Sequence, residues 1–187
     1  MCNKADDKRI CKVCGTKKPL TEFVRDSRTS SGHITTCKAC RGKMASVRIH
    51  DTNRRARAAG VKIDLTVEDI DILLRTFDNE GCIYCGADTT KLEIEHTIPL
   101  SRAGEHSVKN LTMCCRKCNR TKHNRSLIEF YNVSGTFTSE NFTTVVTYLA
   151  LVNKVSRGEM LQRFIDDDIA YKRYEMERTL EKVVSGE

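Results

Sequence analysis

The stretch 82–119 decides how this chain folds, because a pair of cysteines stands at each end of it. It begins Cys82-Ile83-Tyr84-Cys85-Gly86 and ends Cys115-Arg116-Lys117-Cys118-Asn119. Two C-x-x-C pairs at this separation can give four thiolates to one tetrahedral zinc ion, which ties the ends of the segment together. The residues thereby brought close in space are Glu95, His96, Asn110 and Asn119. A zinc site that only held a fold would have little need of them.

The other cysteines predict a second zinc site of the same kind. Eight of the ten cysteines fall into four C-x-x-C pairs. The two pairs outside the stretch 82–119 are Cys11 with Cys14 and Cys37 with Cys40. His33 is an alternative ligand, but four cysteines already complete the shell, so we interpret it as a surface loop residue. Cys2 and Cys114 are left over, and we expect Cys114 to be a buried thiol. The N-terminus shows no export signal and no apolar run is long enough to span a bilayer, so paired thiols indicate zinc ligands in a reducing, cytoplasmic compartment.

Composition argues against one large apolar core and for a polyanionic partner. Charged residues make up 30% of the 187 positions and tryptophan is absent, so small domains held by metal are expected. The formal net charge is +7. Residues 131–187 hold seven basic and nine acidic side chains, so the whole basic excess lies in residues 1–130. Basic charge concentrated near metal sites points to nucleic acid as the partner.

A helix expected over Arg41–Ala59 carries six basic residues against one acid, Asp51, and has too few apolar positions to bury a stripe. We interpret it as an exposed basic helix or linker that follows phosphates, the alternative being a solvated spacer. A second basic group lies around the last cysteine pair. The predicted nucleic-acid-binding residues are Arg41, Lys43, Arg48, Arg54, Arg55, Arg57, Arg116, Lys117, Arg120, Lys122 and Arg125.

Periodicity around the cysteine pairs predicts an α+β fold. Thr66 and Asp69 begin an amphipathic helix over 66–79, and alternation predicts a strand at 92–96 that returns through a second strand near 110–113. A helix after Cys118 would place Asn119 and His123 on one face. Two amphipathic helices, about 140–155 and 159–184, either cover this core or form a homodimer surface. The expected parts are 1–45 (zinc unit), 46–65 (basic helix or linker), 66–134 (catalytic module) and 135–187 (C-terminal helices).

The stretch 82–125 resembles the HNH endonuclease family, whose fold is a ββα-metal module. The resemblance covers about a quarter of the chain and rests on four matches: the motif Cys82-x-x-Cys85-Gly86, the run from Glu95 to Ser101, the pair Asn110-Leu111, and Cys115-x-x-Cys118-Asn119-x-x-Lys122. The N-terminal cysteine unit, with Lys18-Pro19-Leu20-Thr21-Glu22-Phe23, is more loosely similar to phage and bacterial members, including free-standing homing endonucleases.

The resemblance implies hydrolysis of DNA that leaves a 5′-phosphate and a 3′-hydroxyl. The expected partner is double-stranded DNA, and branched DNA is left open as an alternative. His96 suits the general base, because a neutral imidazole accepts a proton near pH 7. Oxygen atoms of Glu95 and Asn119 suit Mg²⁺ or Mn²⁺, with His123 as a third ligand, a phosphate contact or a surface residue. Asn110 would bridge the hairpin and aim the backbone of His96. The family commonly has aspartate before its base histidine, so Glu95 is a departure that bears on the identity of the metal.

Two other classes of protein are alternatives. A non-catalytic zinc-dependent DNA-binding regulator would account for the cysteines and the charge but not for Glu95, His96 and Asn119 together. A thiol redox protein would need one reactive C-x-x-C on a thioredoxin-like frame, which four pairs in two clusters do not supply. His50 and His106 are interpreted as surface residues.

Overall fold

The computed structural model describes residues 7–78, 80–89 and 91–185, and the chain divides into two compact units, Met1–Asp51 and Thr52–Glu187. Each unit contains helices and at least one two-stranded antiparallel sheet, so the α+β class is confirmed. The finer division into four parts stays a prediction. Cys2 lies outside the described residues.

The first unit consists of two short hairpins around four cysteines. One hairpin joins β1 (Lys8–Ile10) to β2 (Lys17–Pro19), and the other joins β3 (Phe23–Arg25) to β4 (His33–Cys37), with a 3₁₀ turn (Leu20–Glu22) between them and α1 (Lys38–Arg41) after them. Its buried apolar cluster contains Phe23, Cys11 and Cys37, with Cys40 packed against it. One aromatic ring and a few thiols bury too little apolar surface to stabilise a unit of this size, which agrees with stabilisation by zinc.

Helix α2 (Ala45–Ala58) corresponds to the basic helix predicted over Arg41–Ala59, but it begins after a turn that follows α1. Its C-terminal half belongs to the second unit. There Thr52 and Ala56, four residues apart and so on one face, are 5% and 0% exposed. The expectation that this helix buries no face is therefore wrong for its C-terminal half. The exposed basic residues there are Arg54, Arg55 and Arg57.

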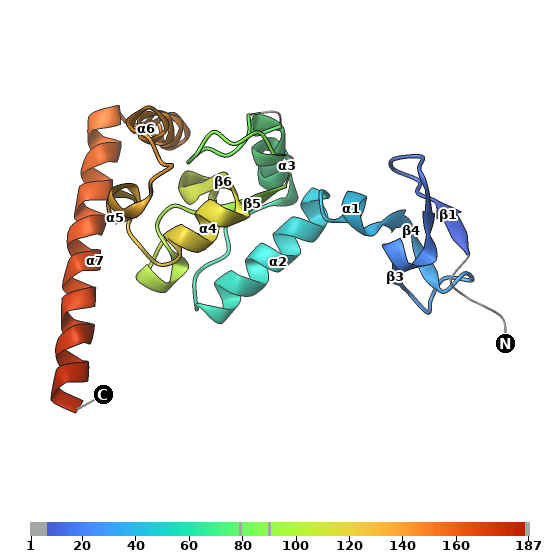
Figure 1. Ribbon diagram of the computed structural model, residues 1–187, viewed down its shortest axis with the longest axis horizontal. Helices are drawn as coiled ribbons and strands as arrows, with labels where there is room; N and C mark the ends of the chain where they lie inside the picture. The colour runs from blue at the N-terminus through green and yellow to red at the C-terminus, as the bar shows by residue number, and fades with distance from the viewer. Residues whose placement is uncertain (1–6, 79, 90, 186–187) are drawn as a thin grey trace. The chain divides into compact units, whose positions relative to one another are not determined.

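The centre of the second unit is a hairpin followed by a helix. Strand β5 (Leu92–His96) pairs antiparallel with β6 (Leu111–Cys115), so that Leu92 lies opposite Cys115 and His96 lies opposite Leu111. Helix α4 (Arg116–Lys122) follows directly and packs against both strands (Figure 1). Two 3₁₀ turns, Leu100–Arg102 and Val108–Asn110, lie in the loop between the strands. The predicted order of strand, strand and helix is confirmed.

Helix α3 (Val67–Thr76) leads into the first cysteine pair of this unit. Its N-cap is the predicted capping box: Thr66 Oγ1 accepts from the Asp69 amide at 3.1 Å, and the Asp69 carboxylate accepts from the Thr66 amide at 2.9 Å. Ile70 and Leu73 are buried, so its apolar stripe is core, as expected. Gly81 has a φ of 72°, and an added Cβ would lie 2.7 Å from the Ala87 carbonyl oxygen. The turn into Cys82 therefore requires glycine.

The helix predicted after Cys118 is two helices in the structure. α4 starts at Arg116 and ends at Lys122, and α5 (Leu127–Val133) begins beyond a break. His123 has a φ of 46° and a ψ of −124°, so the helix cannot continue through it. Ser126 then caps α5 by accepting from the Glu129 amide at 3.0 Å. The prediction that His123 shares a helical face with Asn119 is therefore wrong.

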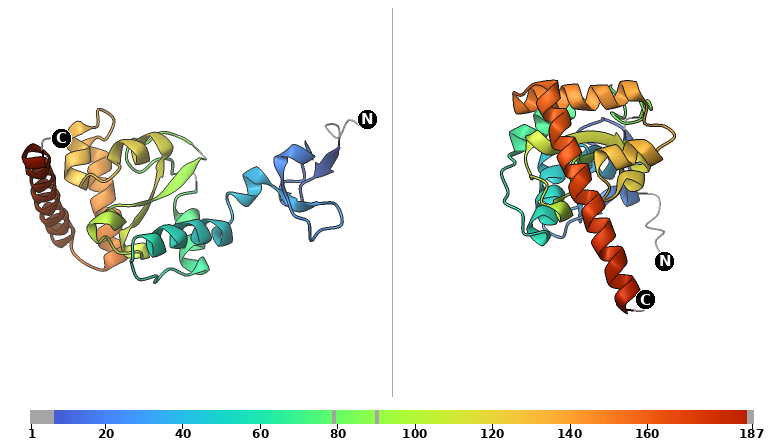
Figure 2. Two further views of the ribbon diagram at one scale, coloured as in Figure 1. Left: turned by 90° about the horizontal axis from the view of Figure 1, so that it is seen from below. Right: turned by 90° about the vertical axis from the view of Figure 1, so that its left-hand side faces the viewer.

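The C-terminal helices cover the module, which is one of the two roles expected for them. α6 (Ser139–Asn153) is capped by Thr138 and buries Val145, Val146, Leu149 and Ala150. α7 (Arg157–Ser185) buries Met160 and Phe164, and Arg102 from the hairpin loop pairs with Asp167 at 2.6 Å. The C-terminal half of α7 extends beyond α5 and α6 (Figure 2). Its exposed apolar and aromatic side chains there are Tyr174, Met176, Leu180, Val183 and Val184.

Within the ranges that the structure describes, none of the helices combines the length and the apolar character that crossing a bilayer requires.

Candidate active site

The four cysteines that bracket the hairpin form one cluster. The ligand atoms of Cys82, Cys85, Cys115 and Cys118 all lie within 4.8 Å of one another. The Cys115 amide donates to Cys82 Sγ at 3.2 Å, and the pKa of Cys82 falls to about 4, mainly through its hydrogen bond with Cys118. Four sulfur atoms, one of them readily ionised, are the donor set of a structural zinc site. The cluster therefore fits zinc and holds the start of α4 against the loop after α3.

Cys114 lies outside this cluster, as predicted. It is 0% exposed, and burial raises the pKa of its thiol. Cys114 therefore contributes to packing as a buried thiol.

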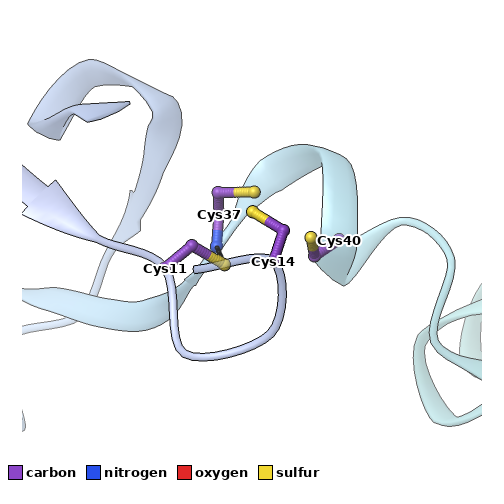
Figure 3. Close-up of side chains that lie close together, drawn as sticks. All are labelled: Cys11, Cys14, Cys37 and Cys40. Carbon is purple, nitrogen blue, oxygen red and sulfur yellow. Dashed lines mark hydrogen bonds between the residues drawn. The ribbon is translucent and has the colours of Figure 1, made fainter. Parts of the chain in front are cut away.

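The first unit carries the second cluster. The sulfur atoms of Cys11, Cys14, Cys37 and Cys40 converge in Figure 3, and all lie within 4.8 Å of one another. The Cys37 amide donates to Cys11 Sγ at 3.3 Å and is the main reason that the pKa of Cys11 falls to about 6. The His33 ring bonds to the Ser31 carbonyl oxygen instead of joining the cluster. The two four-cysteine clusters predicted from the sequence are thus both present.

The loop after β5 is folded tightly by Asn110. Its Oδ1 accepts from the Ile98 amide and its Nδ2 donates to the Ile98 carbonyl oxygen, both at 2.8 Å, while Nδ2 also donates to the Glu105 carbonyl oxygen at 2.9 Å. The backbone carbonyl of Asn110 accepts from the Thr97 amide at 2.9 Å. An added Cβ at Gly104 would lie 1.9 Å from the Ile98 carbonyl oxygen, so that position also requires glycine. These contacts fix the backbone that directly follows His96.

A surface cavity of about 270 Å³ gathers four of the predicted catalytic and metal-binding residues at the end of β5. Glu95 and His96 come from the strand, Asn119 comes from α4, and His123 comes from the break after it. Arg55 and Ala59 reach the same cavity from the end of α2 and the residue after it. Asn110 does not line this cavity, so its role is to hold the conformation of the loop. The cavity holds carboxylate, amide and imidazole groups together, which is a donor set that suits a divalent cation.

Glu95 is nearly buried, at 5% exposure, and both its oxygens already accept hydrogen bonds. The Tyr84 hydroxyl donates to Oε2 at 2.6 Å and the Lys122 ammonium donates to Oε1 at 2.7 Å. Lys122 also donates to the His96 carbonyl oxygen at 3.1 Å. Each carboxylate oxygen has a second lone pair, so Glu95 keeps acceptor capacity toward the cavity. The donor set therefore still fits a cation, with Lys122 as a competing partner.

Glu93 is a residue of this site that the sequence interpretation missed. Asn119 Nδ2 donates to Glu93 Oε2 at 2.7 Å. Because its nitrogen is engaged in this way, the amide oxygen of Asn119 remains for another partner. Strand alternation places Glu93 and Glu95 on the same face, so a period of two could have indicated the role of Glu93.

His106 was also missed, and its interpretation as a surface residue is wrong. It is 2% exposed, and its ring lies between His96 and Asn53 of α2. Burial is the main reason that the pKa of His96 falls to about 3, with smaller contributions from the charges of His106, Lys122 and Arg55. His96 is therefore neutral over the physiological pH range. Nothing in the sequence pattern pairs Asn53 with a histidine 53 positions later. His50 is exposed, as expected.

Most of the predicted nucleic-acid-binding residues are exposed, but one is fully buried. Lys122 is 0% exposed and pairs with Glu95. The expectation that Lys122 contacts a phosphate backbone is therefore wrong, because its ammonium is inside the module. Arg48 and Arg125 are half-buried, and the other predicted contacts are exposed: Arg41, Lys43, Arg54, Arg55, Arg57, Arg116, Lys117 and Arg120.

Comparison with known proteins identifies a family whose model matches the residues of this site. Residues 82–125 match the family model described as HNH endonuclease. No curated protein matches the chain. Among solved structures, the rare-cutting HNH restriction endonuclease PacI aligns at 18% identity over 68% of this chain and 91% of its own, with a TM-score of 0.40. The Type II-C Cas9 enzyme from Actinomyces naeslundii aligns at 22% identity over 80% of this chain and 18% of its own, with a TM-score of 0.37.

The family match coincides with the cysteine cluster, the β5–β6 hairpin and α4. Residues 82–125 of this chain therefore form an HNH endonuclease domain.

Proposed function

We propose that this protein is a divalent-metal-dependent endonuclease that hydrolyses phosphodiester bonds of double-stranded DNA. The observation that carries the proposal is that Glu95, His96, Asn119 and His123 line one cavity within the HNH endonuclease domain. Phosphodiester hydrolysis needs a base for water and positive charge on the phosphate, both held by one scaffold. This cavity offers groups for each role.

His96 is the base in this proposal. Its ring is neutral because burial opposes its protonation, so it has a lone pair available for a water proton. The water oxygen then bonds to phosphorus as the bond from phosphorus to the 3′-oxygen breaks. The leaving 3′-oxygen takes up a proton from a solvent water molecule, His96 later returns its proton to solvent, and the products are a 5′-phosphate and a 3′-hydroxyl.

Glu95 and Asn119 hold the cation, with His123 as a further ligand. Glu93 engages the amide nitrogen of Asn119, which leaves the amide oxygen as the ligand atom. When bound, Mg²⁺ or Mn²⁺ supplies positive charge to the phosphate and to the leaving oxygen. Asn110 acts through the loop alone, because its side-chain bonds go to the backbone of Ile98 and Glu105.

Arg55 binds the substrate phosphate beside the base. It is exposed and lines the cavity with His96. A guanidinium there offers several N–H donors to phosphate oxygens in a planar arrangement that suits them. The exposed basic residues on α2 and α4 extend the contact along the DNA backbone. Two structural zinc ions, one in each four-cysteine cluster, stabilise the units that present these residues.

A second candidate function, DNA binding without cleavage, is favoured by the pairing of Glu95. Both its oxygens are already engaged by Tyr84 and Lys122. If those bonds persist with Mg²⁺ present, the cavity lacks its main anionic ligand and the protein would bind DNA without hydrolysing it. A homodimer through the C-terminal helices stays a prediction, with the exposed apolar residues of α7 as its surface.

The experiment that separates the two functions is incubation of the zinc-loaded protein with supercoiled plasmid in Mg²⁺, in Mn²⁺ and in EDTA. The endonuclease gives nicked or linear DNA only with added metal, and the ends can be ligated because they carry a 5′-phosphate and a 3′-hydroxyl. A His96→Ala protein purified in parallel controls for contaminating nucleases. Tight DNA binding without cleavage in any metal would assign the second function.

A further inference from the structure

A chain of two hydrogen bonds leads from the proposed base to helix α2. His96 Nε2 lies 2.9 Å from His106 Nδ1, and His106 Nε2 lies 2.7 Å from Asn53 Oδ1. The two imidazole planes are inclined by 27°, with centroids 5.2 Å apart. His106 is 2% exposed, so solvent competes little for its ring nitrogens. His106 belongs to neither cysteine cluster and is not one of the residues that line the cavity.

The order of donors and acceptors along this chain follows from Asn53. An amide oxygen can only accept, so His106 Nε2 must carry a hydrogen. Burial lowers the pKa of His106, so the ring is neutral and its Nδ1 has a lone pair. His96 Nε2 must then donate to that lone pair, because two lone pairs facing each other at 2.9 Å would repel. The remaining nitrogen of His96, Nδ1, carries no hydrogen.

We propose that His106, held by Asn53, is the positioning residue that fixes His96 as the Nε2–H tautomer and leaves Nδ1 as the proton acceptor. The proposal rests on the proposed endonuclease function. A histidine that exchanges between its two tautomers presents a lone pair to water only part of the time. A hydrogen-bond acceptor that holds the proton on one ring nitrogen keeps the lone pair of the other nitrogen available all the time. Helix α2 thus supplies the active site with two groups: Arg55 for the phosphate and Asn53 for the tautomer.

A purely structural role for His106 makes a different prediction. If the ring only filled space between α2 and the hairpin loop, leucine would serve as well, because it has a similar size and no need for hydrogen-bond partners. If the acceptor matters, asparagine should serve better than leucine, because its Oδ1 can occupy the place of Nδ1 and accept from His96. The pair His106→Asn and His106→Leu therefore separates the two roles.

The direct test is the tautomer of His96 in the zinc-loaded full chain without Mg²⁺ or DNA. Long-range ¹H–¹⁵N correlation spectra distinguish a protonated from an unprotonated ring nitrogen in each histidine, and His96→Ala identifies the signals of residue 96. The proposal expects Nε2 protonated and Nδ1 unprotonated in the wild type and in His106→Asn, and a mixture of tautomers in His106→Leu. Protonated Nδ1 in the wild type, or an unchanged pattern in His106→Leu, would overturn it.

Cleavage kinetics supply the second readout. His106→Leu is expected to lower kcat by about 10²-fold, the smaller end of what a positioned base contributes, with KM and DNA affinity unchanged. His106→Asn is expected to recover most of that loss, and His50→Leu, at an exposed histidine outside the cavity, is the control for histidine replacement. Equal kcat for the leucine and asparagine variants would overturn the proposal. If the tautomer is as expected but no metal supports cleavage by the wild type, the hydrogen-bond assignment stands and the proposed function fails.

Discussion

The ammonium of Lys122 lies 2.7 Å from Oε1 of Glu95, and the two side chains are 0% and 5% exposed. This buried ion pair joins α4 to β5 beneath the cavity. Lys122 also donates to the His96 carbonyl oxygen, so one side chain fixes both residues that the proposed chemistry uses. The pair has two consequences: it holds the strand and helix in place, and it sets a competition between the lysine and a cation for the same carboxylate.

Replacement of Lys122 by methionine should strongly destabilise the second unit. The change leaves the Glu95 carboxylate buried with only the Tyr84 hydroxyl as partner. Removing one partner of a buried pair costs about 3–5 kcal/mol, since the remaining charge is uncompensated. Urea unfolding of the zinc-loaded protein measures this cost. The matched control is Lys117→Met on the exposed side of α4, which should change the unfolding free energy by less than about 0.5 kcal/mol. Equal midpoints for the two variants would contradict the pairing described.

Replacement of Glu93 by alanine should lower the affinity of the site for the catalytic cation, although Glu93 is not itself a ligand. Asn119 loses the acceptor that orients its amide, so its oxygen is no longer fixed toward the cation. Loss of such an orienting partner typically costs about 10–100-fold in metal affinity. The Mg²⁺ concentration for half-maximal cleavage should rise by about that factor, and excess metal should restore the rate. Glu177→Ala, at an exposed position in α7, should leave the metal dependence unchanged, whereas an unaltered dependence in Glu93→Ala would contradict the role assigned to Glu93.

Metal analysis should find two zinc ions per chain. The Cys11→Ser, Cys14→Ser double variant should retain one, because only the cluster of the first unit loses ligands. Elemental analysis counts the zinc. The ¹H–¹⁵N signals of the hydrogen-bonded rings of His96 and His106 should persist in that variant, since both residues belong to the second unit. The matched Cys82→Ser, Cys85→Ser variant should lose those signals, because zinc binding there contributes directly to folding. Loss of both zinc ions from the first variant would mean that the clusters are not separate sites.

Acid should destabilise the protein partly through His96. Its pKa is lowered from 6.5 to about 3, mainly by burial, so between these values the unfolded chain binds more protons than the folded one. The stability that comes from this shift is fully present above pH 6.5 and is lost as the pH falls toward 3. At pH 5 the loss is at most about 2 kcal/mol.

Urea unfolding at pH 7.5 and pH 5 for the wild type and His96→Leu isolates this contribution. Zinc release and the protonation of carboxylates affect both proteins alike, so the difference between the two pH-induced losses belongs to His96 and its contact with His106. The wild type should lose more stability than the variant by up to that amount. Equal losses would mean that His96 is not held neutral.

The sequence predicts most of the frame of this site because each part has a local signal. The C-x-x-C pairs place both clusters, alternation places β5, and Thr66 with Asp69 places the start of α3. The break at His123 has no such signal: basic and polar residues continue through it, and only the positive φ of that residue ends α4. Local propensity is therefore a poor guide there: Lys122, the last residue of α4, is buried although its sequence neighbours are polar and basic.

The contacts that tune the site could not be predicted, because they join residues far apart in sequence. Asn53 meets His106 across 53 positions, and Lys122 meets Glu95 across 27. A lysine next to basic neighbours is normally exposed, so its burial could not be inferred from charge. Glu93 is the exception, since its alternation with Glu95 along β5 already places both on one face.

The most direct test of the central claim is the single-turnover cleavage rate of His96→Ala relative to wild type at saturating Mg²⁺ or Mn²⁺. Zinc content and DNA affinity are measured on the same samples, so that a folding or binding defect is recognised. The account predicts a loss of about 10²–10⁴-fold in the rate with two zinc ions retained and DNA affinity unchanged. Cleavage by the variant at the wild-type rate would contradict the assignment of His96 as the base and, with it, the active site described here.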